Sequence, residues 1–316
     1  MSVTRLHRLK NEVGHHSLFF VITNRCDTIC RYCSCMPVLR SGWTELPTAI
    51  VIDLLQWFAE RREGLQTVQF SGGEPLLHPG IFQFLRSAQQ LGYITRLQSN
   101  GIAAGSLSDS DALYLKDVRT KISIDGPTSD VHEQYRRKGS FDYVVKGIQR
   151  LVACGVTVGA KAVFSDSNVR YGGDLIRFVG ELGVHGFTYN TMEYVGYARS
   201  LTGRSTTEYE VTRAIIDTLC SREYRHLLNG TNILRWYLAD RPILKDRLPW
   251  FINERGDVFR GQVFRNMQHV GNVYRDKWDE IFHSRNPGYE TMRCEGRTYS
   301  LIKRKLGARN LLTNVR

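Results

Sequence analysis

The sequence contains no apolar run long enough to cross a bilayer, and no secretory signal peptide precedes its first apolar segment. That segment, residues 17–22, is short and rich in β-formers, so we interpret it as a strand. Low-complexity tracts and internal repeats are also lacking. We therefore expect neither a membrane-spanning protein nor a repeat array, and we expect the chain to work in the cytoplasm without a membrane partner.

Cysteine is scarce, with seven residues in 316, and the number is odd. This argues against a disulfide framework, which is typical of small secreted domains, and favours the reducing cytoplasm. The hydrophobic content of 42% and the charged content of 23% are ordinary for a soluble globular protein. The length is sufficient for one large α/β domain, alone or with a small appendage.

The balance of charge is basic. The formal net charge is +12, and residues 201–316 hold 21 Lys and Arg against 13 Asp and Glu. A basic balance favours an anionic partner such as a phosphate, a carboxylate, an acidic peptide or nucleic acid, and it is equally compatible with a solvated surface. The charges are scattered, without the interleaved aromatic residues of a nucleic-acid groove. Charge alone therefore leaves the partner open.

Strand-like and helix-like segments alternate through the first two hundred residues. The expected strands are residues 18–23, 67–70, 94–98, 122–124, 156–164 and 186–190. The expected helices are residues 48–60, 80–91, 141–154 and 174–182. Because alternating strands and helices form right-handed βαβ units, the order predicts an α/β fold with a parallel sheet. Six such units make a partial barrel.

Three cysteines stand close together directly after the first expected strand. Cys26, Cys30 and Cys33 have three residues and then two between them. Three thiolates hold only three irons of a four-iron four-sulfur cluster, so the fourth iron stays open to a ligand that is not protein. The alternative is a closed zinc site with Cys35 as the fourth ligand.

A glycine turn that carries one carboxylate ends the second expected strand, in the segment Phe70–Pro75. Its glycines let a backbone approach a ligand closely, although such a segment is more often a plain strand-to-helix turn. Polar residues also follow the later strands, at 99–101, 123–126 and 192–193. In barrels of parallel strands the reactive residues sit at the C-terminal ends of the strands, so these segments predict one common site.

The cysteine segment and the Gly-Gly-Glu-Pro segment together closely resemble the radical S-adenosylmethionine (SAM) superfamily. In that family the open iron chelates SAM, and reductive cleavage of SAM yields a 5′-deoxyadenosyl radical that abstracts a hydrogen atom from the substrate. The resemblance spans residues 17–199 and implies a partial (β/α)6 TIM-like barrel. It also implies one 4Fe-4S cluster on Cys26, Cys30 and Cys33, SAM, and an electron donor such as flavodoxin or ferredoxin.

The resemblance further implies the residues that contact SAM. Tyr32 matches a position that contacts adenine, and the glycine turn matches the segment that accepts the ammonium group. Ser123 and Arg136 suit the SAM carboxylate. The adjacent Arg137 is the alternative to Arg136 for this role. Asp125 is expected to bond the ribose or to cap its turn, and Asn168 is a weaker candidate for the same neighbourhood. The expected SAM-binding residues are Tyr32, Gly72, Gly73, Glu74, Ser99, Asn100, Ser123, Asp125, Arg136 and Met192.

The C-terminal part resembles a SPASM or twitch extension, a small α+β addition that usually holds auxiliary clusters. The resemblance lies in residues 253–260, 270–273 and 278–282, and a polar tail follows a helix at 278–283. The first auxiliary ligand falls at Gly261, and only Cys294 remains of the later cysteine pair. One cysteine cannot hold a cluster, so we expect a degenerate extension without one.

The expected organisation is a lead-in at residues 1–16, a radical SAM core at 17–199, and a basic C-terminal region at 200–316. That last region contains the degenerate SPASM/twitch-like segment 250–297 and a largely helical stretch at 204–247. Cys294 is either an inert leftover or a thiol that donates a hydrogen atom to the substrate radical, as in radical SAM epimerases. The choice between these two interpretations stays open.

The expected function is maturation of a ribosomal peptide by epimerisation or cross-linking. Only some sixteen residues precede the first strand, so a separate leader-peptide recognition protein is expected as a partner. The alternative is an epimerase, dehydratase or dehydrogenase that acts on a small, anionic molecule such as a sugar, nucleoside or antibiotic precursor. Outside enzymes, the alternatives are a zinc-stabilised nucleic-acid-binding protein and a radical SAM fold that binds SAM without turnover.

Overall fold

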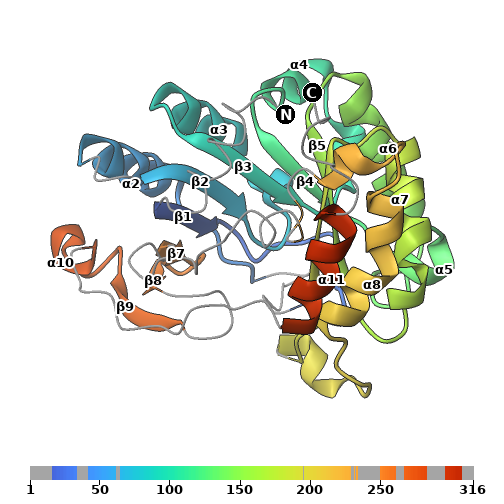
Figure 1. Cartoon of the computed structure of the whole chain (residues 1–316). Coiled ribbons are helices and arrows are strands. Elements are labelled where there is room, and N and C mark those ends of the chain that lie inside the picture. The colour runs from blue at the N-terminus through green and yellow to red at the C-terminus, as the bar shows by residue number, and fades with distance from the viewer. Residues whose placement is uncertain are drawn as a thin grey trace.

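The computed structural model describes residues 16–33, 42–61, 65–194, 196–228, 231, 233, 250–260, 267–282 and 296–307 (Figure 1). Within these ranges, nine strands form a single sheet in the order β6-β5-β4-β3-β2-β1-β7-β8-β9. The strands are β1 (His16–Val21), β2 (Leu65–Ser71), β3 (Ile94–Ser99), β4 (Arg119–Ser123), β5 (Val158–Phe164), β6 (Gly186–Thr191), β7 (Trp250–Ile252), β8 (Asp257–Arg260) and β9 (Gln268–Asn272).

Strands β1 to β6 are the six strands expected from the sequence, and each pairs in parallel with the next. The predicted α/β fold with a parallel sheet is therefore confirmed. The sheet is open, because β1 pairs with β2 and β7 and β6 lies at the far edge. The four expected helices are present as α2 (Thr48–Glu60), α3 (Ile81–Gln90), α6 (Phe141–Ala153) and α7 (Gly172–Glu181).

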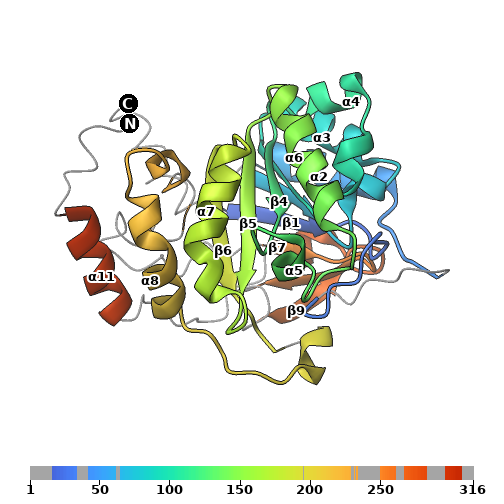
Figure 2. The same cartoon turned by 90° about the vertical axis from the view of Figure 1, so that its right-hand side faces the viewer.

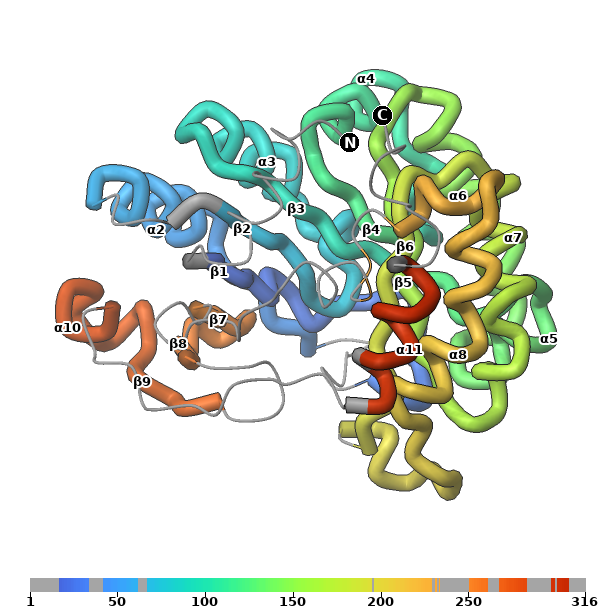
Figure 3. The backbone as a smooth tube through the Cα atoms, viewed as in Figure 1, coloured from blue at the N-terminus to red at the C-terminus, as the bar shows by residue number. Residues whose placement is uncertain are grey.

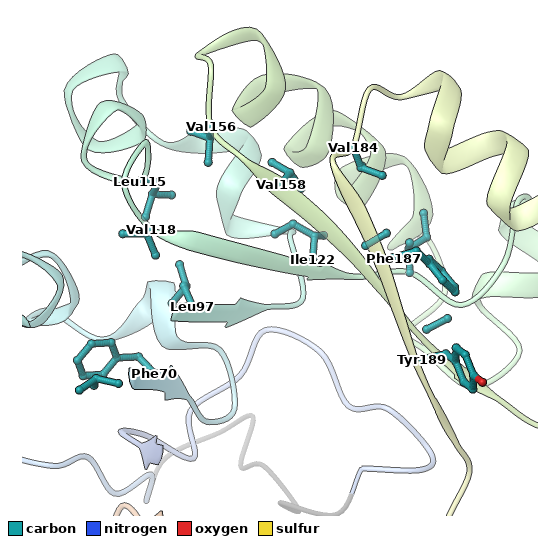
Figure 4. Close-up of a cluster of buried hydrophobic side chains, with 14 of the residues drawn as sticks. Phe70, Leu97, Leu115, Val118, Ile122, Val156, Val158, Val184, Phe187 and Tyr189 are labelled. Atoms are coloured by element: carbon teal, nitrogen blue, oxygen red, sulfur yellow. The ribbon is translucent and has the colours of Figure 1, made fainter. Parts of the chain in front are cut away.

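These four helices cover one face of the sheet (Figures 1 and 2). Strand residues that point toward the helices are buried and apolar, among them Leu97, Ile122, Val158 and Phe187 (Figure 4). Their neighbours along each strand point to the opposite face, because side chains alternate along a strand. We call this second face, turned away from the four helices, the inner face. Two short helices that the sequence pattern did not reveal, α4 (Asp109–Tyr114) and α5 (Ser129–His132), complete the crossovers.

The C-terminal strands extend the parallel sheet beyond β1, as the tube in Figure 3 shows. Strand β7 pairs in parallel with β1, and β8 and β9 follow as antiparallel neighbours. Helix α10 (Trp278–Phe282) packs on α2, where the rings of Trp57 and Phe282 lie 5.4 Å apart and those of Phe58 and Phe282 lie 4.6 Å apart. The β-like character of residues 248–275 was predictable, whereas their pairing with β1 was not.

Helix α8 (Glu208–Leu219) lies between α7 and α11 (Gly296–Gly307) (Figure 2). The sequence suggested only a polar tail after residue 283, and the structure corrects this for residues 296–307. Ile302 and Leu306 stand one helical turn apart and are buried, and Lys305 donates to the carboxylate of Asp217 on α8. None of the helices in the described ranges is both long and apolar enough to span a bilayer.

Candidate functional site

The cysteine loop after β1 and the glycine turn after β2 are joined through their backbones. Gly73 N donates to Thr23 O at 2.7 Å, and Glu74 N donates to Arg25 O at 2.8 Å. A Cβ atom on Gly73 would lie 2.2 Å from Arg25 O, and one on Gly72 would lie 2.4 Å from Thr23 O. Both glycines are therefore required where the turn meets the start of the cysteine loop.

Glu74 links the turn after β2 to the turn after β3. Its side chain is fully buried, and its carboxylate accepts from Leu76 N at 3.0 Å and from Asn100 N at 2.7 Å. Burial raises the pKa of Glu74 to about 7, against the opposing effect of the hydrogen bond from Asn100 N. Because backbone donors reach both of its oxygens, Glu74 holds the two turns in fixed relation.

Asn100 carries this connection on to the cysteine loop. Its Nδ2 donates to Asp27 Oδ1 at 2.6 Å and lies 3.7 Å from Cys26 Sγ, while its Oδ1 accepts from Ile102 N. Ser99 Oγ accepts from Gly101 N at 2.9 Å, and the Ser99 side chain also hydrogen-bonds Glu74. Residues that follow three adjacent strands are thus connected around Cys26.

The three cysteines of the loop are free thiols. Cys26 is buried, whereas Cys30 and Cys33 are half-buried. Burial raises the pKa of the Cys26 thiol above its usual range and raises that of Cys30 to about 11, although Arg136 lowers the latter. A metal that binds here displaces the thiol protons.

The donor set of the cysteine loop suits a four-iron four-sulfur cluster. Three thiols on one loop can each bind a different iron of such a cluster. The amide of Asn100 lies 3.7 Å from Cys26 Sγ, and the guanidinium of Arg136 lies 3.9 Å from Cys30 Sγ. Both groups are donors that can hydrogen-bond the thiolate sulfurs of a bound cluster.

A buried ion pair lies beside Cys30. The guanidinium of Arg136 donates from Nε to Asp125 Oδ2 and from Nη2 to Oδ1, and the phenol of Tyr32 also donates to Oδ2. Val163 N completes the set by donating to Oδ1 at 2.9 Å. Burial is the largest effect on the pKa of Asp125 and raises it, but the charge of Arg136 and the hydrogen bonds from Arg136 and Tyr32 together outweigh burial and hold that pKa below its usual value.

The two candidate arginines occupy different places. The Nη1 atom of Arg136 lies 3.9 Å from Cys30 Sγ, and the side chain is buried. Arg137 is exposed, and its Nη1 donates at 2.8 Å to the carbonyl oxygen of Asp27, between two of the cysteines. Arg136 therefore faces the site, while Arg137 holds the outside of the loop.

The remaining expected residues also lie at strand ends. Ser123 ends β4 and is buried, and Met192 directly follows β6, where its N donates to Phe164 O at 2.7 Å. The segment after β6 returns to the cysteine loop, because Tyr197 N donates to Cys33 O at 3.0 Å.

Asn168 donates to the carbonyl oxygens of Asp125 and Val163, so its role here is to fix the turn after β5. Gly261, Cys35 and Cys294 fall outside the described residues, so their assignments stay predictions.

His132 belongs to this neighbourhood and was not identified from the sequence. It lies on α5, fully buried, and its Nδ1 accepts from Asp125 N at 3.2 Å. Burial lowers the pKa of His132 to about 4, and the charge of Arg136 acts in the same direction. The only sequence signal was its place seven residues after Asp125, on the far side of the Gly126–Pro127 turn.

Comparison with known proteins shows a likeness to one superfamily. Residues 20–166 match the model of the radical SAM superfamily. The chain is 26% identical over 195 residues to the AdoMet-dependent heme synthase of Oleidesulfovibrio alaskensis, a match that covers 60% of this chain. It is 25% identical over 288 residues to the antilisterial bacteriocin subtilosin biosynthesis protein AlbA of Bacillus subtilis, a match that covers 84% of this chain.

The matched regions span 49% and 59% of the length of these two relatives. Among solved structures, Streptococcus suis SuiB bound to S-adenosylmethionine superposes with a TM-score of 0.65 at 16% identity, covering 89% of this chain and 68% of SuiB. SuiB bound to the precursor peptide SuiA superposes with a TM-score of 0.64 at 15% identity, over 89% of this chain and 67% of SuiB. At this identity the likeness to SuiB establishes the fold.

Proposed function

We propose that this chain, whose residues 20–166 match the radical SAM superfamily, is a radical SAM enzyme in which Cys26, Cys30 and Cys33 hold one 4Fe-4S cluster beside a bound SAM molecule. When bound, the cluster and SAM together supply the 5′-deoxyadenosyl radical that removes a hydrogen atom from the substrate. The observation that carries the proposal is the network around the loop. The glycine turn, Asn100 and Arg136 all converge on the backbone or thiols of the cysteine loop.

The residues around the loop divide into positioning and binding roles. Glu74 holds the glycine turn in place, and backbone carbonyl groups of such a turn are suited to accept from the SAM ammonium group. Arg136 is oriented by Asp125, and its Nη1 points toward Cys30, where it is suited to the SAM carboxylate. Tyr32 supplies an aromatic ring for adenine, and Ser123, Ser99 and Met192 line the same end of the sheet.

For the substrate, we propose a ribosomally made peptide that is epimerised or cross-linked. AlbA, named for subtilosin biosynthesis, and SuiB, solved with a precursor peptide, support a peptide substrate. The second candidate is a small molecule, which the likeness to a heme synthase favours. We also propose an electron donor such as flavodoxin or ferredoxin and a leader-peptide recognition protein as further partners.

Iron analysis tests the cluster. We expect about four irons per chain after anaerobic purification, since three thiolates support one such cluster. The triple variant Cys26→Ala/Cys30→Ala/Cys33→Ala should lose them. The control is Cys154→Ala, which removes a thiol at the end of α6, outside the loop, and should retain the iron. Zinc in place of iron, or iron that survives in the triple variant, would refute the proposed site.

Product analysis tests the reaction. Under reduction with dithionite, the wild type should convert SAM to 5′-deoxyadenosine and methionine, and the triple cysteine variant should not. A candidate peptide deuterated at its α-carbons should then transfer deuterium to 5′-deoxyadenosine, as detected by mass spectrometry. Cleavage of SAM without transfer from any peptide, together with transfer from a small molecule, would select the second candidate.

A further inference from the structure

Cys26 has a carboxylate and an amide as its polar neighbours. Its Sγ atom lies 4.0 Å from Asp27 Oδ1 and 3.7 Å from Asn100 Nδ2. The two neighbours also bind each other, because Asn100 Nδ2 donates to Asp27 Oδ1 at 2.6 Å. An amide nitrogen carries two donor hydrogens, so one serves Asp27 and the other is directed at the sulfur. One of the three thiols therefore stands beside both an anion and a hydrogen-bond donor.

The turn after β3 sets the orientation of the Asn100 amide. Its Oδ1 atom accepts from Ile102 N at 2.9 Å, so the oxygen is occupied and the nitrogen faces Asp27 and Cys26. The side chain of Asn100 is buried, with 8% of its residue exposed. Water therefore competes little for its N–H groups, and a hydrogen bond in such surroundings is stronger than one in water.

Asp27 is held beside Cys26 from two directions. Arg137 Nη1 donates to the Asp27 carbonyl oxygen at 2.8 Å, and Asn100 donates to the carboxylate. Burial raises the pKa of the Cys26 thiol most, and the charges of Glu74 and Asp27 raise it further, although the backbone amide of Thr28 lowers it. A negative charge on Asp27 thus opposes the gathering of more negative charge on this sulfur.

The two neighbours act on an added electron in opposite directions. Reduction of an iron–sulfur cluster adds negative charge, and the sulfur ligands share it. A carboxylate 4.0 Å from the sulfur repels that charge, whereas an N–H group directed at the sulfur stabilises it. Net charge and hydrogen bonds to the sulfurs are among the factors that set the reduction potential of such clusters.

We propose that Asp27 and Asn100 set the reduction potential of the cluster, with Asp27 lowering it and Asn100 raising it. The inference rests on the proposed function, for which it names the residues that govern how readily an electron enters from the donor protein. Glu74 and Arg136 also adjoin the thiols, but Glu74 joins two turns and Arg136 belongs to a buried ion pair. Asp27 and Asn100 are therefore the residues to exchange.

A redox titration of the anaerobically reconstituted protein, followed by EPR without SAM, tests this. In Asp27→Asn the amide oxygen still accepts from Asn100, but the negative charge is removed. We expect the ratio of reduced to oxidised cluster at a fixed potential to rise about 10-fold, which is an upward shift of about 59 mV for a one-electron couple. Asn100→Leu removes the donor, so we expect the same ratio to fall about 10-fold.

A second carboxylate–amide pair supplies matched controls. Asp257 Oδ1 accepts from Asn272 Nδ2 at 2.8 Å, and these residues belong to β8 and β9 and not to the cysteine loop. In Asp257→Asn and Asn272→Leu we therefore expect the wild-type potential. Shifts of opposite sign at Asp27 and Asn100, with none in the control pair, distinguish tuning of the cluster from general damage, which has no reason to change sign between two bonded neighbours.

Iron is counted in every variant before the titration. Potentials that stay unchanged, or that move in the same direction in Asp27→Asn and Asn100→Leu, would overturn the inference. Loss of iron from either variant would also overturn it, because the residue would then hold the loop and not tune the cluster. Absence of iron from the wild type, or of 5′-deoxyadenosine from its reaction, refutes the proposed function instead, so the two failures are distinguishable.

Discussion

Asp125 and Arg136 form an ion pair in which the exposed fractions of the two side chains are only 2% and 7%. The carboxylate accepts from Arg136 through both oxygens and also accepts from Tyr32 and from Val163 N. Because every charged oxygen is hydrogen-bonded, the pair tolerates its burial. The pair holds Arg136 beside Cys30 and connects β4, β5 and the cysteine loop.

Removal of either charged partner should therefore lower the free energy of unfolding considerably. For Asp125→Asn we expect the free energy of unfolding to fall by about 3–5 kcal/mol, because the buried guanidinium loses its counter-charge. Urea denaturation of the apoprotein measures this. The control is Asp174→Asn, which breaks an ion pair to Arg177 whose side chains are 59% and 53% exposed and should cost at most about 1 kcal/mol. Equal effects of the two substitutions would contradict the importance of the buried pair.

The glycine turn should not tolerate a side chain. In Gly73→Ala the new Cβ atom would lie 2.2 Å from Arg25 O, so the cysteine loop must move. We expect this variant to retain less than about a tenth of the wild-type iron after reconstitution, since a ligand displacement of about 1 Å disables such a site. Gly105→Ala is the control, because its nearest neighbour would be 3.6 Å away. Full iron content in Gly73→Ala would refute the close fit of the two loops.

His132 should make the fold sensitive to acid. The folded pKa is about 4 and the ordinary value is 6.5, so below pH 6.5 the unfolded chain binds a proton that the folded chain does not. The contribution of His132 is therefore complete above pH 6.5 and is lost as the pH falls toward 4. The loss amounts to at most about 3 kcal/mol.

Unfolding by urea at several pH values between 4 and 7 tests this. In His132→Asn the amide oxygen can still accept from Asp125 N, but the group does not titrate in this range. We expect the stability of this variant to depend less on pH than that of the wild type, with similar stability at pH 7. The imidazole of His132 should also show no protonation by NMR down to pH 5.

The aromatic contacts of α10 should hold the C-terminal strands against α2. Trp278 packs edge-on against Trp57 at 6.3 Å and donates from Nε1 to Val273 O. For Trp278→Ala we expect a loss of about 3–5 kcal/mol and faster proteolysis between β7 and α10. Tyr143→Ala is the control, because Tyr143 is 53% exposed on α6 and should cost less than about 1 kcal/mol. Unchanged proteolysis of Trp278→Ala would show that β-pairing alone holds this segment.

Many helices and strands of the fold could be predicted from the sequence because the residue patterns that indicate them are local. The apolar period of residues 48–60 matches the bounds of α2, and the strand expected at residues 156–164 contains β5. The cysteine spacing and the glycine turn were likewise sufficient to predict a cluster loop beside a second loop. Helix α11 was missed because its buried residues are few and are surrounded by Lys and Arg.

The sequence by itself determined the order of strands and helices, the three-cysteine loop and the likeness of residues 20–166 to the radical SAM superfamily. Only the tertiary structure decided which distant residues meet. Register places Phe251 beside Phe19, more than two hundred positions away, and puts Thr188 beside Lys161. The loops after the strands close so that Glu74 accepts a hydrogen bond from Asn100 N, and so that Asp125 forms an ion pair with Arg136. Periodicity reports the face on which a side chain lies, whereas its neighbours on that face depend on strand pairing and loop closure, which no local pattern encodes.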